Sequence, residues 1–379
     1  MINVLLVSPR LPAFDTRYCG DHAYTDTLLQ YPPPGIRYHH YQDLIESGQA
    51  RRIKWLYRIG PRLARWGILP PDMWAEYITS DYVPDILHVY GFSAVVRFPK
   101  SVTQVPTLLG AGAGSYSDLK YYLGWSQESI HRGRWMKRQY LRLIDAHDSS
   151  LRPENAKRVL VWSQFSRRMH LDEDYVRPEQ IAVLYPGLPI RKHRAITNGR
   201  LREITYLFIG KDFKRKNGQL VLEAFRRVRS VHPRAKLILV GLPPDGEIIR
   251  EAGVIHLHFI QRDELLERVY PSADVLVLPS QSEGFGLVLL EAMSFGMPVI
   301  GINGWAMPEI IDHGVTGLLT PLNSVHDLAR NMMRFIKAPN DLEAMAKNAR
   351  AQFKKRFSIE EHNSHLRKKY DECLSTHRR

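Results

Sequence analysis

The chain has 379 residues, of which 44% are hydrophobic and 24% are charged, as in a soluble globular protein with room for about two domains. No run of about eighteen apolar residues is present, so the sequence predicts no membrane-spanning helix. The two cysteines form neither a metal-binding spacing nor a disulfide framework, which favours a reducing compartment such as the cytoplasm. The formal net charge of +14 suggests an anionic partner: nucleic acid, anionic lipid or an acidic substrate.

The first half of the chain alternates predicted strands and helices. Residues 2–7 form an apolar run directly after the first Met, which predicts a buried strand rather than a secretory signal. A loop punctuated by proline leads to Gly20, and residues 21–29 are expected to form the first helix. Further buried strands are predicted at 84–91, 105–109, 158–162 and 181–187. This alternation implies a parallel, doubly wound sheet.

Residues 49–69 contain six basic residues and no acidic one. Apolar side chains recur between them every three or four positions, which predicts a basic amphipathic helix. Two interpretations remain open. Residues 51–66 form a surface that meets anionic lipid headgroups, or they form a packed helix whose arginines are solvated.

The second half repeats the pattern after a polar, basic stretch at 191–202 that is typical of a linker between domains. A strand is predicted at 204–209, and a loop rich in lysine and arginine joins it to a helix at 219–229. More strands are predicted at 236–241, 254–257, 274–278 and 298–301, and the chain from about Ser324 onward is expected to be helical. The second half therefore predicts another parallel sheet.

A turn flanked by glycine joins the strand at 274–278 to a helix predicted at 288–293. The backbone N–H groups at the start of this helix form a site that favours a phosphate. Glu283 in the turn and Glu291 in the helix are better suited to bind hydroxyl groups, such as those of a ribose or a hexose. The alternative is that both are solvated charges beside the helix dipole.

The segment 282–292 and the Gly-Met-Pro at 296–298 resemble the E-x7-E signature of retaining GT-B glycosyltransferases of family four. These enzymes transfer a sugar from a nucleoside diphosphate sugar. The resemblance implies an α/β fold of two Rossmann-like, doubly wound domains that face a donor-binding cleft, with a C-terminal helix that crosses back to the first domain. The implied parts are an acceptor-binding domain (1–190), a linker (191–202), a donor-binding domain (203–357) and the terminal helix (358–379).

The resemblance also implies roles for individual residues. Glu283 contacts hydroxyls of the donor sugar and Glu291 binds the ribose, while Lys211 and Lys216 clamp the diphosphate. Lysine at 211, where the family has arginine, keeps the charge but loses the bidentate fork. The implied catalytic residues are Lys211, Lys216 and Glu283, and the implied donor-binding residues are Gly20, Gly210, Gly284, Phe285, Gly286, Leu287 and Glu291.

The sequence departs from the family after the strand at 105–109, where many members have a histidine. His88 and His22 are the candidates to replace it if the fold brings them near the site. We therefore keep two readings: a metal-independent, retaining glycosyltransferase, and a nucleotide-sugar-binding protein without activity. Neither needs a cofactor, because the nucleotide sugar is a co-substrate.

The expected acceptor is a glycan or a lipid-linked molecule, and the expected location is the cytoplasm or the inner face of its membrane. A nucleic-acid binder, which the charge alone would allow, lacks any recognised nucleic-acid-binding module.

Overall fold

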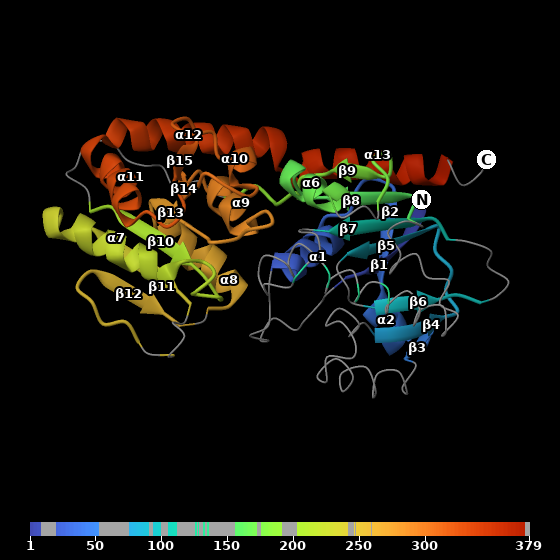
Figure 1. The fold of residues 1–379 in the computed structure, drawn as a ribbon. Helices are drawn as coiled ribbons and strands as arrows, with labels where there is room; N and C mark the ends of the chain where they lie inside the picture. Colours follow the sequence, from blue (N-terminus) through green and yellow to red (C-terminus); the bar gives the residue numbers. More distant parts are fainter. Residues whose placement is uncertain are drawn as a thin grey trace. The chain divides into compact units, whose positions relative to one another are not determined.

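The computed structural model describes residues 1–8, 20–52, 76–90, 94–99, 105–111, 156–172, 176–191, 203–241, 248–258 and 260–375, and the single positions 126, 128, 132, 135 and 246. Contacts between residues divide the chain into two compact units (Figure 1). The first comprises Met1–Leu11, Asp21–Tyr185 and His362–Arg379, and the second comprises Pro12–Gly20 and Pro186–Glu361. No helix in the described part of the chain is long and apolar enough to cross a bilayer.

The first unit is built on a parallel sheet of six strands in the order β2-β1-β5-β7-β8-β9. Its strands are β1 (Ile2–Val7), β2 (Ile36–His40), β5 (Ile86–Tyr90), β7 (Thr107–Ala111), β8 (Arg158–Val161) and β9 (Ile181–Val183). Its helices include α1 (Gly20–Gln30), α2 (Tyr41–Glu46) and α6 (Gln164–Asp172). The predicted strands and the first helix are therefore confirmed. Their side chains are buried because both faces of a parallel sheet are covered.

A small second sheet in this unit corrects one prediction. It contains β3 (Ala50–Arg52), β4 (Glu76–Ser80) and β6 (Ala94–Arg97), and β3 pairs antiparallel with β4. The helix predicted over 49–69 is therefore wrong at Arg51 and Arg52, which lie in a strand. Pairing with β4, far along the chain, overrides the local helical periodicity. The rest of the proposed lipid-facing stretch, from residue 53, lies outside the described residues.

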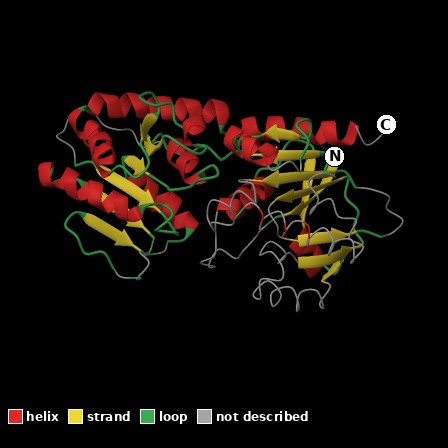
Figure 2. Ribbon diagram, in the orientation of Figure 1, coloured by secondary structure: helices red, strands yellow, loops and turns green. Residues whose placement is uncertain are grey.

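The second unit has a parallel sheet in the order β12-β11-β10-β13-β14-β15 (Figure 2). Its strands are β10 (Thr205–Ile209), β11 (Lys236–Val240), β12 (Val254–Leu257), β13 (Val275–Val277), β14 (Val299–Ile302) and β15 (Gly317–Thr320). Its helical segments are α7 (Gly218–Val231), α8 (Arg262–Glu264), η4 (Leu265–Val269), η5 (Tyr270–Ser272), α9 (Leu287–Ser294), α10 (Met307–Ile310), α11 (Val325–Lys337) and α12 (Pro339–Arg356).

The core of the second unit lies on both faces of this sheet. Tyr206 and Phe208 of β10 pack with Phe225 of α7 and Phe335 of α11 in one apolar cluster. Leu207, between the two β10 aromatics, is also fully buried and points to the other face, because neighbouring strand residues alternate. Covering both faces leaves the strand ends as the places where loops can carry chemistry.

The terminal helix α13 (Ile359–Ser375) completes the core of the first unit. The Tyr370 hydroxyl lies 2.7 Å from Nδ1 of His88 and 2.9 Å from the Tyr38 hydroxyl. Nδ1 of His362 donates to the Tyr185 carbonyl at 2.7 Å, and Nε2 lies 3.0 Å from the Tyr24 hydroxyl. Burial lowers the pKa of His88 to about 3 and that of His362 to about 4, so both rings are neutral at pH 7.

Candidate active site

The turn between β13 and α9 has the strand-turn-helix form that the sequence predicts. Gly286 caps α9 with a φ of 96°, and no side chain caps the helix. A Cβ at Gly286 would approach Cγ of Glu283 to 3.2 Å, so glycine suits both the conformation and the close packing. Phe285 is buried and its ring packs edge-on against Phe357, with 6.3 Å between the centroids. Phe285 therefore anchors the turn.

Glu283 forms a nearly buried ion pair with Lys216. Oε2 of Glu283 accepts hydrogen bonds from Nζ of Lys216 and, at 3.3 Å, from Oγ of Ser280. The Lys216 and Glu283 side chains are only 11% and 12% exposed. Burial lowers the pKa of the Lys216 ammonium, while the Glu283 carboxylate acts in the opposite direction. The β10–α7 loop and the β13–α9 turn are thus joined by opposite charges.

The loop after β10 explains why Lys216 lies there. Its backbone N–H donates to the Asp212 carbonyl at 2.9 Å, which closes a turn. A Cβ at Gly210 would meet the Phe208 ring at 2.7 Å and Cβ of Lys216 at 3.0 Å, so glycine permits this close approach. Lys211, the other predicted cation, is exposed in the same turn.

Arg215 is a neighbour of Glu283 to which our sequence analysis gave no role. Its Nη1 donates to the Ser282 carbonyl at 2.9 Å and lies 3.8 Å from Oε2 of Glu283. Its Nε donates to Asp212 at 3.2 Å. The position directly before Lys216 was the only signal in the sequence that could have identified it.

Glu291, on α9, is held by two other side chains. Its Oε2 accepts a hydrogen bond from the Tyr270 hydroxyl at 2.7 Å, and its Oε1 accepts one from Nη2 of Arg262 at 3.0 Å. Burial raises the pKa of the Tyr270 phenol well above its usual value, and the Glu291 carboxylate raises it further, so the phenol keeps its proton and donates. No spacing in the sequence identifies Arg262 or Tyr270 as partners of Glu291.

Amide side chains connect the β10–α7 loop with the β13–α9 turn and with the loop after β15. Nδ2 of Asn217 donates to Oδ1 of Asn323 at 2.9 Å, and Nε2 of Gln281 donates to Oδ1 of Asn217 at 3.4 Å. These residues follow β10, β15 and β13, whose carboxyl ends share one edge because all neighbours in the sheet are parallel. In open α/β sheets ligands bind at that edge.

The family model for glycosyl transferases group 1 matches residues 189–352, all of which lie in the second unit. Residues 189–352 are therefore similar to the group 1 glycosyltransferases.

The group 1 match agrees with named relatives. The chain is 27% identical over 249 residues to a D-inositol 3-phosphate glycosyltransferase of Corynebacterium kroppenstedtii, an alignment that covers 58% of this chain and 54% of that protein. It is 32% identical over 152 residues to an N-acetyl-alpha-D-glucosaminyl L-malate synthase of Bacillus anthracis, covering 39% of this chain and 40% of that protein. The chain thus spans about half the length of these relatives.

Solved structures show the fold of this chain. HepE of Anabaena, in complex with UDP and glucose, aligns with a TM-score of 0.64 at 16% identity, covering 98% of this chain and all of that one. Sucrose-phosphate synthase of Thermosynechococcus elongatus aligns with a TM-score of 0.61 at 18% identity, covering 99% and 100%. Together with the two six-stranded parallel sheets, these likenesses establish the GT-B fold.

The site residues that the resemblance implied fall into three groups. Lys216, Glu283 and Gly286 are brought together, with Gly284, Phe285 and Leu287 in the same turn, and Glu291 follows one turn into α9. Gly210 and Lys211 lie in the loop that carries Lys216. Gly20 is the first residue of α1.

The two histidines proposed to replace the missing one, His22 and His88, both belong to the first unit. His88 is 1% exposed and its Nδ1 contacts Tyr370 in the core of the first unit. The described contacts of His88 are those of a core residue. The side chain of His22 lies outside the described residues.

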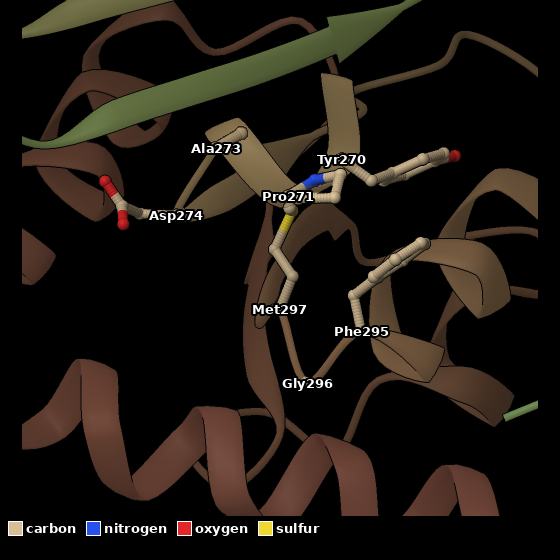
Figure 3. A pocket seen from close by; sticks show the side chains of 7 residues that line it. All are labelled: Tyr270, Pro271, Ala273, Asp274, Phe295, Gly296 and Met297. Carbon is tan, nitrogen blue, oxygen red and sulfur yellow. The ribbon is translucent and has the colours of Figure 1, made fainter. Parts of the chain in front are cut away.

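A pocket in the second unit lies at the opposite edge of its sheet (Figure 3). It is lined by Tyr270, Pro271, Ala273, Asp274, Phe295, Gly296 and Met297. Asp274 precedes β13 and accepts a hydrogen bond from the backbone N–H of Thr205, the first residue of β10, so the pocket is at the amino ends of the strands.

Proposed function

We propose that this chain transfers a sugar, with retention, from a nucleoside diphosphate sugar to a glycan or lipid-linked acceptor. The observation that carries the proposal is the pair of glutamates around the start of α9, each held by a different cation. One carboxylate is placed in the turn and the other one turn into the helix, as two neighbouring parts of a donor require. The glycosyltransferase names of the relatives support the same class of reaction.

Lys216 is the group that we propose stabilises the leaving diphosphate. Negative charge develops on a phosphate oxygen as the bond to the sugar breaks, and a cation in a nearly buried site stabilises that charge strongly. An ammonium has three N–H donors, so Lys216 can keep Glu283 and still donate to a phosphate. The uncapped start of α9 would supply backbone N–H groups to the same diphosphate. We propose that these groups stabilise the charge on the leaving diphosphate without a metal ion.

Glu283 is assigned to the hydroxyls of the donor sugar. Oε2 is occupied by Lys216 and Ser280, which leaves acceptor capacity mainly on Oε1. A carboxylate held by an ammonium is a weak nucleophile, so Glu283 orients the sugar rather than forming a covalent intermediate. This supports a front-face reaction in which the acceptor attacks from the side that the diphosphate leaves.

Donor turnover tests the proposal against a protein that only binds nucleotide sugars. UDP-glucose is the first donor to use, because the solved structure of HepE contains it. A transferase releases UDP slowly with water and faster when an acceptor is added. A chain that binds UDP-glucose and releases no UDP with any acceptor would be a binding protein, and the proposal would be wrong.

Binding to an anionic membrane surface remains part of the proposal for a lipid-linked acceptor. It rests on the charge of residues 51–66 and on the net charge of +14. Such a surface would bring the chain to the cytoplasmic face of a membrane reversibly, because salt screens the attraction. Sedimentation with anionic and neutral vesicles at low and high salt tests it directly.

A further inference from the structure

Both carboxylate oxygens of Glu291 accept hydrogen bonds from side chains that lie outside α9 and outside the β13–α9 turn. Tyr270 is the first residue of η5 and reaches Oε2, while Arg262 is the first residue of α8 and reaches Oε1. All three side chains lie in the second unit, and Glu291 is only 7% exposed. The carboxylate therefore cannot rotate without breaking a charge-assisted hydrogen bond.

These two hydrogen bonds leave specific acceptor positions of the Glu291 carboxylate for a ligand. A carboxylate offers about four acceptor positions, two on each oxygen. The two hydrogen bonds use one on each oxygen, so one position on each remains. Two neighbouring hydroxyls on a five-membered ring present two donors side by side, which matches this remaining pair.

Tyr270 is itself held firmly. It is 1% exposed, and its ring stacks on Phe295 with 5.3 Å between the centroids and 12° between the planes. Figure 3 shows the two rings lying against each other, with the Tyr270 oxygen directed away from the other labelled side chains. The Tyr270 ring thus lines the pocket, while its hydroxyl donates a hydrogen bond to Glu291. A hydroxyl fixed in this way adds direction as well as a hydrogen bond.

Arg262 provides the charge for the same purpose. Its side chain is 21% exposed and lies where β12 leads into α8. A guanidinium is charged at every physiological pH and has a planar set of donors, so Arg262 gives Oε1 of Glu291 a directional, charge-assisted hydrogen bond.

We propose that Tyr270 and Arg262 are positioning residues that set Glu291 to select a ribose with both hydroxyls over its deoxy forms. The inference rests on the proposed function, in which Glu291 binds the nucleoside. It predicts that selection for the ribose hydroxyls can be lost while affinity for the diphosphate is kept.

The test compares the full-length wild-type chain with Tyr270→Phe by calorimetry. The probes are UDP and GDP, each beside its 2′,3′-dideoxy analogue. We expect the wild type to bind the ribose form of its nucleotide about tenfold or more tightly than the dideoxy form, since hydrogen bonds to charged groups are strong. In Tyr270→Phe this ratio should fall by about fivefold to tenfold, because the ribose form binds more weakly and the dideoxy form binds as before. Arg262→Gln should lower the ratio at least as much.

Tyr206→Phe is a matched control. Its hydroxyl is also buried and donates to the Met332 carbonyl at 2.7 Å, but it lies in the core of the same unit away from Glu291. It should cost stability and leave the ratio unchanged. Adding Tyr270→Phe to Glu291→Gln should have little further effect on the ratio if the tyrosine acts through the glutamate.

The outcomes separate this inference from the proposed function. If the wild type selects ribose and turns over donor while Tyr270→Phe and Arg262→Gln keep the full ratio, the positioning role is wrong and the function stands. If the wild type binds a nucleotide but does not distinguish the dideoxy form, the ribose contact itself is wrong. If the wild type binds neither UDP nor GDP, both the inference and the proposed donor class are overturned.

Discussion

Replacing Lys216 with methionine should affect stability and activity in different ways, and a second substitution separates them. Methionine keeps most of the length of the side chain but removes the ammonium. The Glu283 carboxylate would then retain only Oγ of Ser280, at 3.3 Å, and Nη1 of Arg215, at 3.8 Å. A buried charge that loses its main partner destabilises the folded state.

The magnitude follows from the burial of the pair. Removing one partner of a fully buried ion pair costs about 3–5 kcal/mol of the free energy of unfolding. The Lys216 and Glu283 side chains are 11% and 12% exposed, and Ser280 and Arg215 would still lie beside the Glu283 carboxylate. We therefore expect Lys216→Met to lower the free energy of unfolding by about 2–3 kcal/mol. Glu283→Gln on top of it removes the stranded charge and should bring the free energy back to within about 1 kcal/mol of the wild type. Lys214→Met, at an exposed lysine of the same loop, should change it by less than about 0.5 kcal/mol.

Activity should not follow stability. Loss of a donor to the leaving group lowers kcat by about a hundredfold or more, and the double variant should not recover it. Urea unfolding of the full chain measures the free energies, and hydrogen exchange in β10 and β13 locates the change in the second unit. An unchanged Lys216→Met in both measurements would mean that the ion pair does not form in solution. A double variant as active as the wild type would rule out the role of Lys216 with the diphosphate.

Two other predictions test the rest of the structure. His88 and His362 have folded pKa values of about 3 and 4, below the usual 6.5, so the unfolded chain binds more protons between about pH 6.5 and pH 4. The contribution of the two histidines to the free energy of unfolding should be fully present above about pH 6.5. Below that pH it should fall by up to about 1.4 kcal/mol per pH unit for each histidine. A urea midpoint that stays level from pH 7 to pH 4.5 would contradict this. Glu291→Gln should weaken binding of UDP itself, while Glu283→Gln should spare UDP and reduce the affinity or turnover of UDP-glucose; calorimetry with both ligands separates them, and variants that behave alike would show that the two roles are not separate.

Local patterns in the sequence predicted the elements of the fold well, because each depends on its own residues. The apolar run before Pro279 and the glycines after Glu283 were enough to predict the strand, the turn and the helix of the site. The same local logic failed at Arg51, whose strand exists only because β4 pairs with it.

Partners across the site could not be predicted, because nothing local encodes them. Glu283 meets Lys216 from 67 positions away, and Glu291 meets Arg262 from 29 positions away. His88 lies in a predicted strand, and it became a catalytic candidate because the histidine that many family members have after the strand at 105–109 is absent from this sequence. Only the fold brings Tyr370, 282 positions later, onto its ring and makes it part of the core.

The place of α13 in the first unit has a consequence for how the chain is made. The second unit includes the continuous stretch 186–361, whereas the first unit needs His362 to Ser375, which the ribosome adds after that stretch. At about 5–20 residues per second, the first sheet therefore waits roughly ten to thirty-five seconds for Tyr370 and His362 to arrive. During that interval His88 and Tyr24 lack their partners from α13. The newly made chain thus presents an unfinished N-terminal core to chaperones, and removal of α13 should damage the half of the protein that was synthesised first.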